Sequence, residues 1–169
     1  ISPKEAEIMD QRQRHLLQEK WKALEDAGYG VADLKKYKIG MFVGVEEGDY
    51  SSLAKKYDSV TSSHDGILAA RLAYFLNLSG AVMSINTACS SSLTAIHLAC
   101  DAIRNGEISM AIAGGISLML TPLGHILTSQ VGMQSLDGKC KTFDESAQGT
   151  VFSEGCGVVI LKELLQAQE

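Results

Sequence analysis

The sequence predicts an α/β fold in which a mostly parallel sheet packs against buried helices. Short apolar runs bounded by glycine alternate with longer segments of helical periodicity, as in proteins with parallel sheets. The strand-like runs show no polar alternation, which is typical of strands buried on both faces. Of the 169 residues, 46% are hydrophobic and 21% charged, so the chain can form a substantial core and intrinsic disorder is not expected. The length fits one domain or one large piece of a domain.

An amphipathic helix and a buried strand are expected in the N-terminal part. Asp10 with Gln13 forms a variant of the capping box, and apolar residues recur at helical spacing until Gly28, which predicts a helix over residues 10–28. The run KIGMFVGV at 38–45 is short, β-rich and bounded by glycine. It predicts a strand of a parallel sheet.

Two buried helices and a second strand are expected in the middle of the chain. A polar, serine-rich stretch with one short helical turn precedes residues 67–76, which are apolar on most sides and predict a buried helix. The run at 81–88 predicts a strand that leads directly into the next helix. Because that helix carries no charge before Asp101, we expect it to lie deep in the core and to end at 105–106.

Two further strands are expected in the last third of the chain. The first covers 110–120, where a pair of glycines marks a place for the close approach of another backbone or a ligand. Residues 121–150 are turn-rich and mostly irregular, with LDGK and FDES as expected turns, and such long segments in compact domains usually serve a function. Residues 151–162 predict the last strand.

Charge and hydropathy exclude several classes of protein. The chain has 15 basic and 20 acidic residues, a formal charge of −5 and no cluster of Lys or Arg, so no nucleic-acid partner is expected. No apolar run approaches the roughly 18 residues that span a bilayer, and the charged N-terminal stretch lacks the apolar centre of a signal peptide. We therefore expect a cytoplasmic protein without a membrane partner.

Cys89 has the sequence context of a nucleophile. A strand that runs through Thr87 and Ala88 into Cys89 and a long helix places the sulfur at a helix N-terminus, where unpaired N–H groups and the helix dipole favour a thiolate. Small neighbours allow a substrate to approach, and the serines at 90–92 can satisfy helix-start donors. From these residues alone, a small buried hydrophobic cysteine is an equally good interpretation.

A nucleophilic cysteine usually needs a base, and the four histidines are the candidates for Cys89. His97 lies eight residues along the same helix, roughly 12 Å along its axis, so we interpret it as a packing residue. His15 and His64 fall in surface-like segments and are expected to be solvated. His125, in the turn-rich region, stays open as a candidate.

The other cysteines are interpreted as structural. Cys100 shares a helical face with Cys89 but is too distant for a disulfide within the helix, and we expect it in the core. Cys140 and Cys156 flank turns and are also expected to be structural. The four cysteines show no CxxC pair and no zinc-finger spacing to histidine, which predicts reduced thiols and no bound metal.

The segment GAVMSINTACSSSLTAIHLAC at 80–100 resembles the active-site segment of β-ketoacyl synthases, in particular the ketosynthase domains of modular polyketide synthases. Four further segments resemble this family in the same order, namely ISPKEAEIMDQRQRHLLQEKWKALEDAG (1–28), IGMFVGV (39–45), AIAGG (111–115) and DGKCKTFDESAQGTVFSEGCGVVILK (137–162). The resemblance covers essentially the whole chain. It implies a thiolase-like fold and identifies Cys89 as the catalytic nucleophile.

The resemblance further implies an acyltransferase that performs a decarboxylative Claisen condensation. In such enzymes the cysteine takes an acyl chain from the phosphopantetheine thioester of an acyl carrier protein, and the enolate of a malonyl-type extender then attacks the acyl-cysteine. No cofactor is bound directly, because the phosphopantetheine arm of the carrier delivers the substrates. The resemblance also implies a homodimer, joined through the strand that precedes the nucleophile.

Residues 1–169 are expected to be a partial ketosynthase domain, its N-terminal half without the first strand. The chain begins at Ile1 and stops at Glu169, soon after a strand-like run, and the His-Gly-Thr, Asn-Ala-His and Gly-Phe-Gly motifs of the family do not occur in it. By analogy, the half-sheet has the strand order 3-2-1-4-5, so that its central strand would be the absent one. We expect the chain alone to be inactive.

The chain departs from the family in its loops rather than at the nucleophile. Gln11 and Leu136 stand where proline is usual, and Phe152-Ser153 replaces a more familiar Pro-Gly. Met133 is a candidate for the acyl pocket by analogy, with an ordinary core position as the alternative.

Two other functions stay open. A non-elongating ketosynthase would transfer or bind acyl chains without condensing them, and would differ at the histidine of the first absent motif. A chain-length factor is a non-catalytic dimerisation subunit that usually lacks the cysteine, so the presence of Cys89 argues against it.

Overall fold

The computed structural model of the chain describes residues 1–53 and 63–168. Its helices and strands are α1 (Pro3–Ile8), α2 (Gln11–Asp26), α3 (Val31–Leu34), β1 (Ile39–Gly44), α4 (Tyr50–Leu53), α6 (Asp65–Leu76), β2 (Val82–Ile85), α7 (Ser91–Arg104), β3 (Met110–Ser117), α8 (Leu123–Gln130), β4 (Gly155–Lys162) and α9 (Leu164–Ala167). The expected helical turn of the serine-rich stretch is α4, and residues 54–62 of that stretch lie outside the described residues.

The four strands form one sheet in the order β2-β1-β3-β4. β1 is parallel to both β2 and β3, whereas β4 is antiparallel to β3. The sheet is therefore mostly parallel, as expected, but mixed. Because no helix crosses the sheet between β3 and β4, the chain re-enters the sheet at the end where β3 stops and runs antiparallel to β3. The expectation that the central strand of a 3-2-1-4-5 order is the absent one was wrong, because β1 and β3 pair directly over six residue pairs and leave no position for a strand between them.

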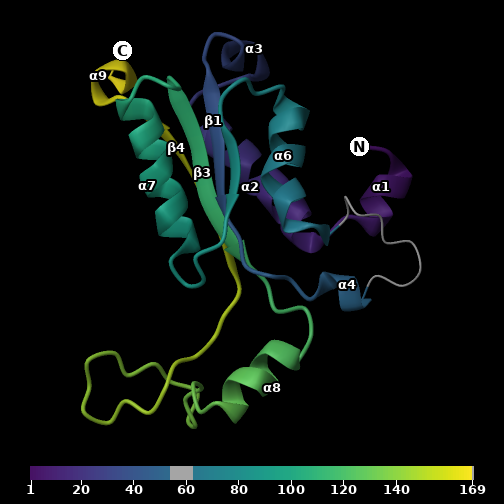
Figure 1. Ribbon diagram of the computed structural model, residues 1–169, viewed down its shortest axis with the longest axis vertical. Helices are drawn as coiled ribbons and strands as arrows, with labels where there is room; N and C mark the ends of the chain where they lie inside the picture. Colours follow the sequence, from purple (N-terminus) through teal and green to yellow (C-terminus); the bar gives the residue numbers. More distant parts are fainter. Residues whose placement is uncertain (54–62, 169) are drawn as a thin grey trace.

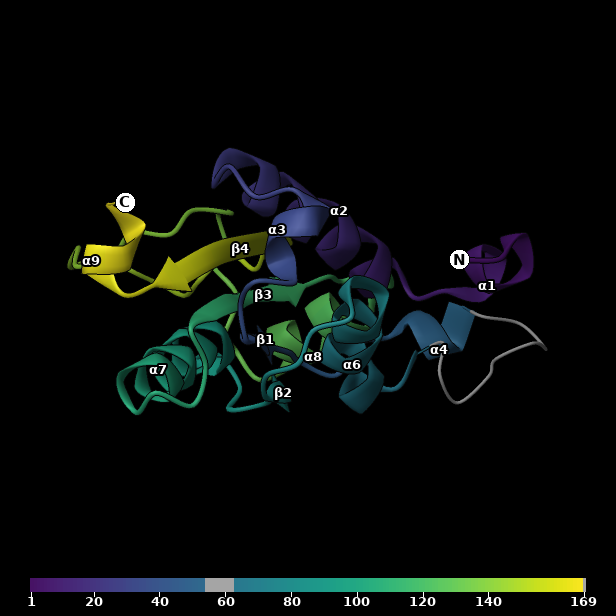
Figure 2. The ribbon, with the colours of Figure 1, turned by 90° about the horizontal axis from the view of Figure 1, so that it is seen from above.

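Helices cover both faces of the sheet and give three layers. α2 and α6 lie on one face and α7 on the other (Figure 1), and the view from above separates α2 from α7 in the same way (Figure 2). Every residue of β1 is buried, which confirms the expected strand. Alternate side chains of β1 enter two cores: Met41 packs on the side of α2 and α6, and Phe42 packs against the alanines of α7.

Two helices are less buried than the sequence predicted. α7 buries one stripe of small residues, and Leu93 on another side of it is 71% exposed. α6 likewise leaves Tyr74 and Phe75 exposed. The prediction was wrong because apolar composition does not show how many sides of a helix have a neighbour, and the described residues pack on one side of each. Among the described residues, no helix combines the length and apolar character needed to cross a bilayer.

Several local signals hold, and one element was missed. Asp10 caps α2, with its carboxylate accepting the Arg12 N–H at 2.8 Å; the capping box expected with Gln13 was wrong, because the Gln13 N–H donates to the Asp10 backbone carbonyl at 3.0 Å. As expected, α7 ends before Gly106, with Asn105 as its C-cap and a φ of +70° at Gly106. The turns expected at LDGK and FDES are present. However, the turn-rich region also contains α8, which stands beyond the end of the sheet rather than on one of its faces (Figure 1).

Candidate active site

Cys89 lies in the turn between the edge strand β2 and the start of α7, as the sequence predicted. Its side chain is exposed rather than buried in the core. The preceding residue, Ala88, has a left-handed backbone with φ of +55°. Because such a conformation costs a residue with a Cβ on the order of 1 kcal/mol or more, its occurrence next to the cysteine is typical of a functional turn.

The hydroxyl groups of the two residues that follow Cys89 hold this turn. Ser90 Oγ donates to the Thr87 carbonyl at 2.9 Å, and Ser91 Oγ donates to the Ala88 carbonyl at 2.7 Å. Ser91 Oγ also accepts the Thr87 N–H at 2.9 Å. The expectation that the serines satisfy helix-start donors was therefore wrong for these two: Ser90, the N-cap residue, makes no side-chain cap, and both hydroxyls tie the helix to the end of β2.

Two glycines on neighbouring strands allow the first turn of α7 to pack directly against the sheet. Gly44 and Gly115 are paired in register at the carboxyl ends of β1 and β3. A Cβ on Gly44 would lie 2.6 Å from Ser92 Cα, and a Cβ on Gly115 would lie 2.7 Å from Ser92 Cβ. The close approach expected at the glycine pair of β3 is thus confirmed. It determines how near to the sheet α7 begins, and therefore where Cys89 lies.

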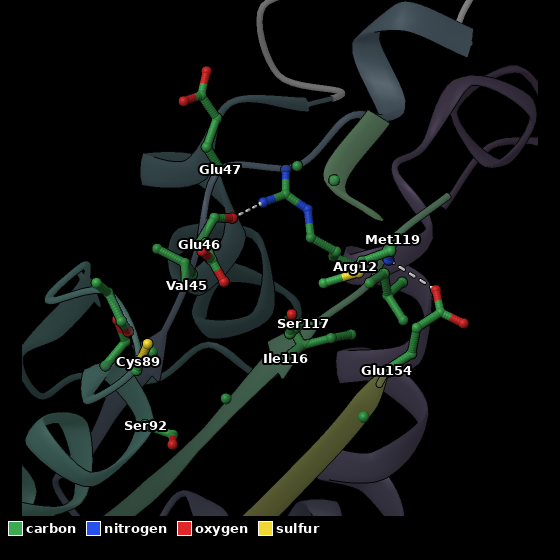
Figure 3. A pocket seen from close by; sticks show the side chains of 18 of the residues that line it. Arg12, Val45, Glu46, Glu47, Cys89, Ser92, Ile116, Ser117, Met119 and Glu154 are labelled. Carbon is green, nitrogen blue, oxygen red and sulfur yellow. Dashed lines mark hydrogen bonds between the residues drawn. The ribbon is translucent and has the colours of Figure 1, made fainter. Parts of the chain in front are cut away.

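A cleft of about 1150 Å³ opens beside Cys89. In Figure 3, Cys89 and Ser92 lie on one side of it, and Met119 and Glu154 on the other. Apolar side chains from α7, β3, α8 and the approach to β4 line much of the cleft, among them Ile96, Ile116, Leu118, Leu123, Leu127 and Phe152. A cleft of this size and character can hold an extended, largely apolar acyl chain next to the sulfur.

Arg12 lies at the rim of the cleft, and no local sequence pattern marks it. Its side chain is only 3% exposed, and its guanidinium bonds the Asp10 carboxylate through Nε at 3.0 Å and Nη2 at 2.7 Å. Nη1 donates to the Glu46 carbonyl at 2.6 Å (Figure 3) and to Asp65 Oδ1 at 2.8 Å. Burial lowers the pKa of the Arg12 guanidinium, but the bonds and charges of the two carboxylates outweigh it, so the pKa is raised.

Two carboxylates hold the residues that follow β3. Asp49 accepts the Leu120 N–H at 3.2 Å, the Thr121 N–H at 2.7 Å and the Thr121 hydroxyl at 2.6 Å. Partial burial raises the pKa of Asp49, but these hydrogen bonds outweigh it, and the pKa lies below its ordinary value. Glu154 Oε1 accepts the Met119 N–H at 2.8 Å (Figure 3). Neither carboxylate carried a recognisable signal in the sequence, because their partners lie far away along the chain.

The histidines lie outside the lining of this cleft. His97 is not the packing residue that was expected: its side chain is 68% exposed and its Nε2 lies 3.2 Å from Asp101 Oδ2. His15 and His64 are exposed as predicted, and His64 also caps α6 by accepting the Gly66 N–H at 3.0 Å. His125 Nδ1 lies 3.2 Å from the side-chain amide nitrogen of Gln134.

The remaining cysteines differ from one another. Cys100 is partly buried, and Cys156 packs against the core, where burial first and the charge of Glu19 second raise the pKa of its thiol to about 11. Cys140 is exposed, so its expected structural position was wrong. Hydrogen bonds from the Thr150 hydroxyl and the Val151 N–H lower the pKa of the Cys140 thiol.

Met133 is 48% exposed and does not line the cleft, so neither an acyl-pocket position nor a core position describes it in this structure. Among residues 1–53 and 63–168, no group of His, Cys, Asp and Glu is arranged to hold a metal ion.

Comparisons with known proteins agree in sequence and in structure. Residues 1–167 match the family model described as the N-terminal domain of β-ketoacyl synthases. The chain is 47% identical over 167 residues to the polyketide synthase ThaG of Burkholderia thailandensis, and 46% identical over 169 residues to the polyketide synthase PksM of Bacillus subtilis. It is covered almost completely in both alignments, 99% and 100%, but spans only 3% and 4% of those proteins.

Solved structures give the same picture. The chain superposes on a ketosynthase from module 6 of the bacillaene synthase of Bacillus subtilis with a TM-score of 0.90 and 46% identity. It superposes on an oxazolomycin ketosynthase domain from Streptomyces albus with a TM-score of 0.91 and 39% identity. In each case 99% of this chain is covered, against 29% and 31% of the solved chain.

Proposed function

The chain belongs to the β-ketoacyl synthase family, and we propose that it forms part of a polyketide ketosynthase in which Cys89 is the nucleophile that carries the acyl chain. The single observation that supports this most strongly is the position of Cys89. Its exposed sulfur stands at the N-terminus of α7, in a strained turn, on the wall of the large apolar cleft. Helix N-termini favour anions, and a thiolate is the reactive form of cysteine.

In the proposed first step, the Cys89 thiolate attacks the carbonyl carbon of an acyl thioester on the phosphopantetheine arm of an acyl carrier protein. The carbonyl π electrons move to oxygen, and the tetrahedral oxyanion then collapses and expels the thiolate of the carrier. Backbone N–H groups at the start of α7, including that of Cys89, are the donors available to this oxyanion in the chain. The acyl chain then occupies the cleft, where the side chains of α8 and the end of β3 form its apolar wall.

In the proposed second step, a malonyl-type extender loses CO₂. The resulting enolate attacks the carbonyl carbon of the acyl-cysteine, a carbon–carbon bond forms, and the Cys89 thiolate leaves. The family performs this chemistry with two histidines from His-Gly-Thr and Asn-Ala-His motifs, neither of which occurs in this sequence. We therefore propose that residues 1–169 act as a partial domain that supplies the nucleophile and one wall of the acyl cleft. No cofactor beyond the phosphopantetheine arm of the carrier is needed.

The proposed partners are an acyl carrier protein and a second ketosynthase domain. β2 lies at the edge of the sheet, and its Val82 and Met83 side chains are 38% and 44% exposed. An edge strand with exposed apolar side chains is suited to pairing with the same strand of a second copy.

A non-elongating ketosynthase is the alternative enzyme, since acyl transfer to Cys89 requires only the first step. A chain-length factor is not favoured, because the structure keeps an exposed cysteine in a strained turn beside an acyl-sized cleft.

The test uses the complete ketosynthase domain that contains this chain. Acylation from an acyl carrier or a small thioester, followed by intact-mass analysis, should be abolished by Cys89→Ala and should persist in the matched variant Cys100→Ala, whose thiol lies in the middle of α7. Acyl adducts that persist on the Cys89→Ala protein would remove Cys89 as the nucleophile.

A further inference from the structure

The helix α8 forms part of the wall of the cleft, although it stands apart from the body of the molecule. It contributes Leu123, Leu127 and Thr128 to the lining. Figure 1 shows it beyond the end of the sheet, and among the described residues it makes no extended packing contact with another helix or strand. Within the described part of the chain, its position relative to Cys89 is therefore set by the segments that lead into and out of it.

The carboxylate of Asp49 holds the segment that leads into α8. Its two oxygens accept both backbone N–H groups of Leu120 and Thr121 as well as the Thr121 hydroxyl, at 2.6 to 3.2 Å. The Thr121 hydroxyl oxygen in turn accepts the Leu123 N–H, at the first residue of the helix, at 3.4 Å. Hydrogen bonds to an ionised carboxylate are roughly twice as strong as neutral ones, so this is a firm attachment between two loops that are distant in sequence.

Arg12 fixes the loop that carries Asp49. Its guanidinium donates to the Glu46 carbonyl at 2.6 Å and lies so close to Gly48 that a Cβ there would be 2.6 Å from Nε. Arg12 is itself held by Asp10 and Asp65, at 2.7 and 2.8 Å. The buried guanidinium thus connects the start of α2 with the loop at 46–49, and Asp49 connects that loop with α8.

We propose that Asp49, anchored through Arg12, is a positioning residue that holds α8 against the acyl cleft and so favours long acyl chains on Cys89. This inference rests on the proposed function of Cys89. A short acyl group needs only the surroundings of the sulfur, whereas a long chain also needs the wall that α8 provides. Loss of Asp49 releases that wall but leaves the turn at Cys89 in place, because the Ser90 and Ser91 hydroxyls hold that turn independently at 2.9 and 2.7 Å.

The experiment measures acylation of Cys89 in the complete domain with two probes, acetyl and decanoyl N-acetylcysteamine thioesters, by intact mass. Asp49→Ala should lower the decanoyl rate constant about tenfold or more and leave the acetyl rate constant within about twofold, since misplacement of a binding wall by about 1 Å can cost that much. Asp49→Asn keeps one acceptor oxygen and should be intermediate. Arg12→Lys keeps the charge but loses the planar set of guanidinium donors, and it should also reduce the decanoyl rate constant selectively.

The matched control is Asp33→Ala. Asp33 also accepts a backbone N–H, from Gly30 at 3.1 Å, but it lies on α3, at the opposite end of the molecule from α8 (Figure 1). The acetyl and decanoyl rate constants of the Asp33→Ala domain should equal those of the unchanged domain. Hydrogen–deuterium exchange over 118–130 should rise in Asp49→Ala and not in Asp33→Ala.

Equal loss of both rate constants in Asp49→Asn, or unchanged rates with unchanged exchange in Asp49→Ala, would overturn the positioning role. If the unsubstituted domain takes up neither thioester at Cys89, the proposed function is overturned instead. The exchange measurement would still decide whether Asp49 holds α8.

Discussion

Gly44 of β1 and Ser92 of α7 are in contact backbone to backbone, so that a Cβ on Gly44 would lie 2.6 Å from Ser92 Cα. Gly115 on the neighbouring strand leaves space for the Ser92 side chain in the same way. The first turn of α7 therefore rests directly on the carboxyl ends of β1 and β3. Because Cys89 lies only three residues before Ser92, these contacts fix the proposed nucleophile relative to the cleft.

Gly115→Ala should misplace Cys89. The added methyl group would lie 2.7 Å from Ser92 Cβ, so the start of α7 must move away from the sheet. We expect the free energy of unfolding to fall by about 1–3 kcal/mol, as in overpacked cores. We also expect acylation of Cys89 in the complete domain to slow by about tenfold or more. Chemical denaturation and intact-mass acylation measure the two effects.

Gly157→Ala is the matched control for this prediction. It makes the same change on β4, where a Cβ would meet no heavy atom within 4 Å, and both quantities should stay unchanged. If Gly115→Ala lowers stability but acylates as fast as the unchanged domain, the glycines support the fold and do not position the nucleophile.

The strands and the place of Cys89 could be predicted from the sequence because their signals are local. The run that became β1 is apolar at every position and bounded by glycine, and the strand-to-helix transition at Cys89 is visible in the change of residue types along the chain. The resemblance to the family added the expected reaction, which is acyl transfer to Cys89 followed by condensation. Neither depends on knowing which distant segments meet.

What could not be predicted depends on long-range contacts. Asp49 and Thr121 are 72 positions apart, and Arg12 and Asp65 are 53 apart, so no local pattern marks these pairs. The antiparallel direction of β4 follows from the path of residues 118–154 beyond the end of the sheet, which composition does not specify. The exposure of Leu93 and His97 on α7 was misjudged for the same reason, since burial requires a neighbour.

Lys20 should make the stability of the chain depend on pH. Its side chain is 1% exposed between α2 and α6, Nζ donates to the Leu72 carbonyl at 3.2 Å, and burial lowers the pKa to about 8. In the unfolded chain the pKa returns to about 10.4. Between these values the unfolded state binds more protons, so the free energy of unfolding rises as pH rises through the window. The penalty of on the order of 3 kcal/mol is complete below pH 8 and absent above the unfolded pKa.

Lys20→Met should therefore stabilise the 169-residue chain at pH 7 and flatten the rise in stability between pH 8 and about 10.4. Lys22→Met is the control, because Lys22 is 66% exposed and pairs with Glu19 at the surface. Urea unfolding at a series of pH values compares the three proteins. A Lys20→Met curve parallel to that of the unchanged chain would show that Lys20 does not titrate in this range.

The 169-residue chain alone should form no β-ketoacyl product when acyl and malonyl carriers are supplied. The His-Gly-Thr and Asn-Ala-His motifs do not occur in its sequence. One oxyanion or enolate donor is worth about 3 kcal/mol, so the loss of two lowers the rate by a factor on the order of 10⁴. Mass spectrometry of the carrier-bound products is the measurement, and detection of a condensed product would contradict the assignment of that chemistry to the absent motifs.

The last prediction concerns the free edge of the sheet. Within the described residues β2 pairs only with β1, and Met83 is 44% exposed on the same side of the strand as Ile85, which packs against the α7 side of the core. If two copies of the complete domain pair through β2, Met83 becomes buried in the interface. Met83→Asp would then place an unpaired charge there, and breaking an interface in this way costs several kcal/mol. We expect Met83→Asp to shift the domain from dimer to monomer and to reduce its activity.

Sedimentation velocity and circular dichroism separate this effect from unfolding. Ile85→Asp places its charge partly in the core of the same subunit, so it should destabilise the fold as well as the dimer, whereas Met83→Asp should give a folded monomer. Leu93→Asp is a matched control on α7, where the side chain is 71% exposed and lies away from the strand edge. A Met83→Asp domain that is folded, fully dimeric and active would show that β2 is not the interface, and the exposed apolar side chains of this edge would then need another neighbour.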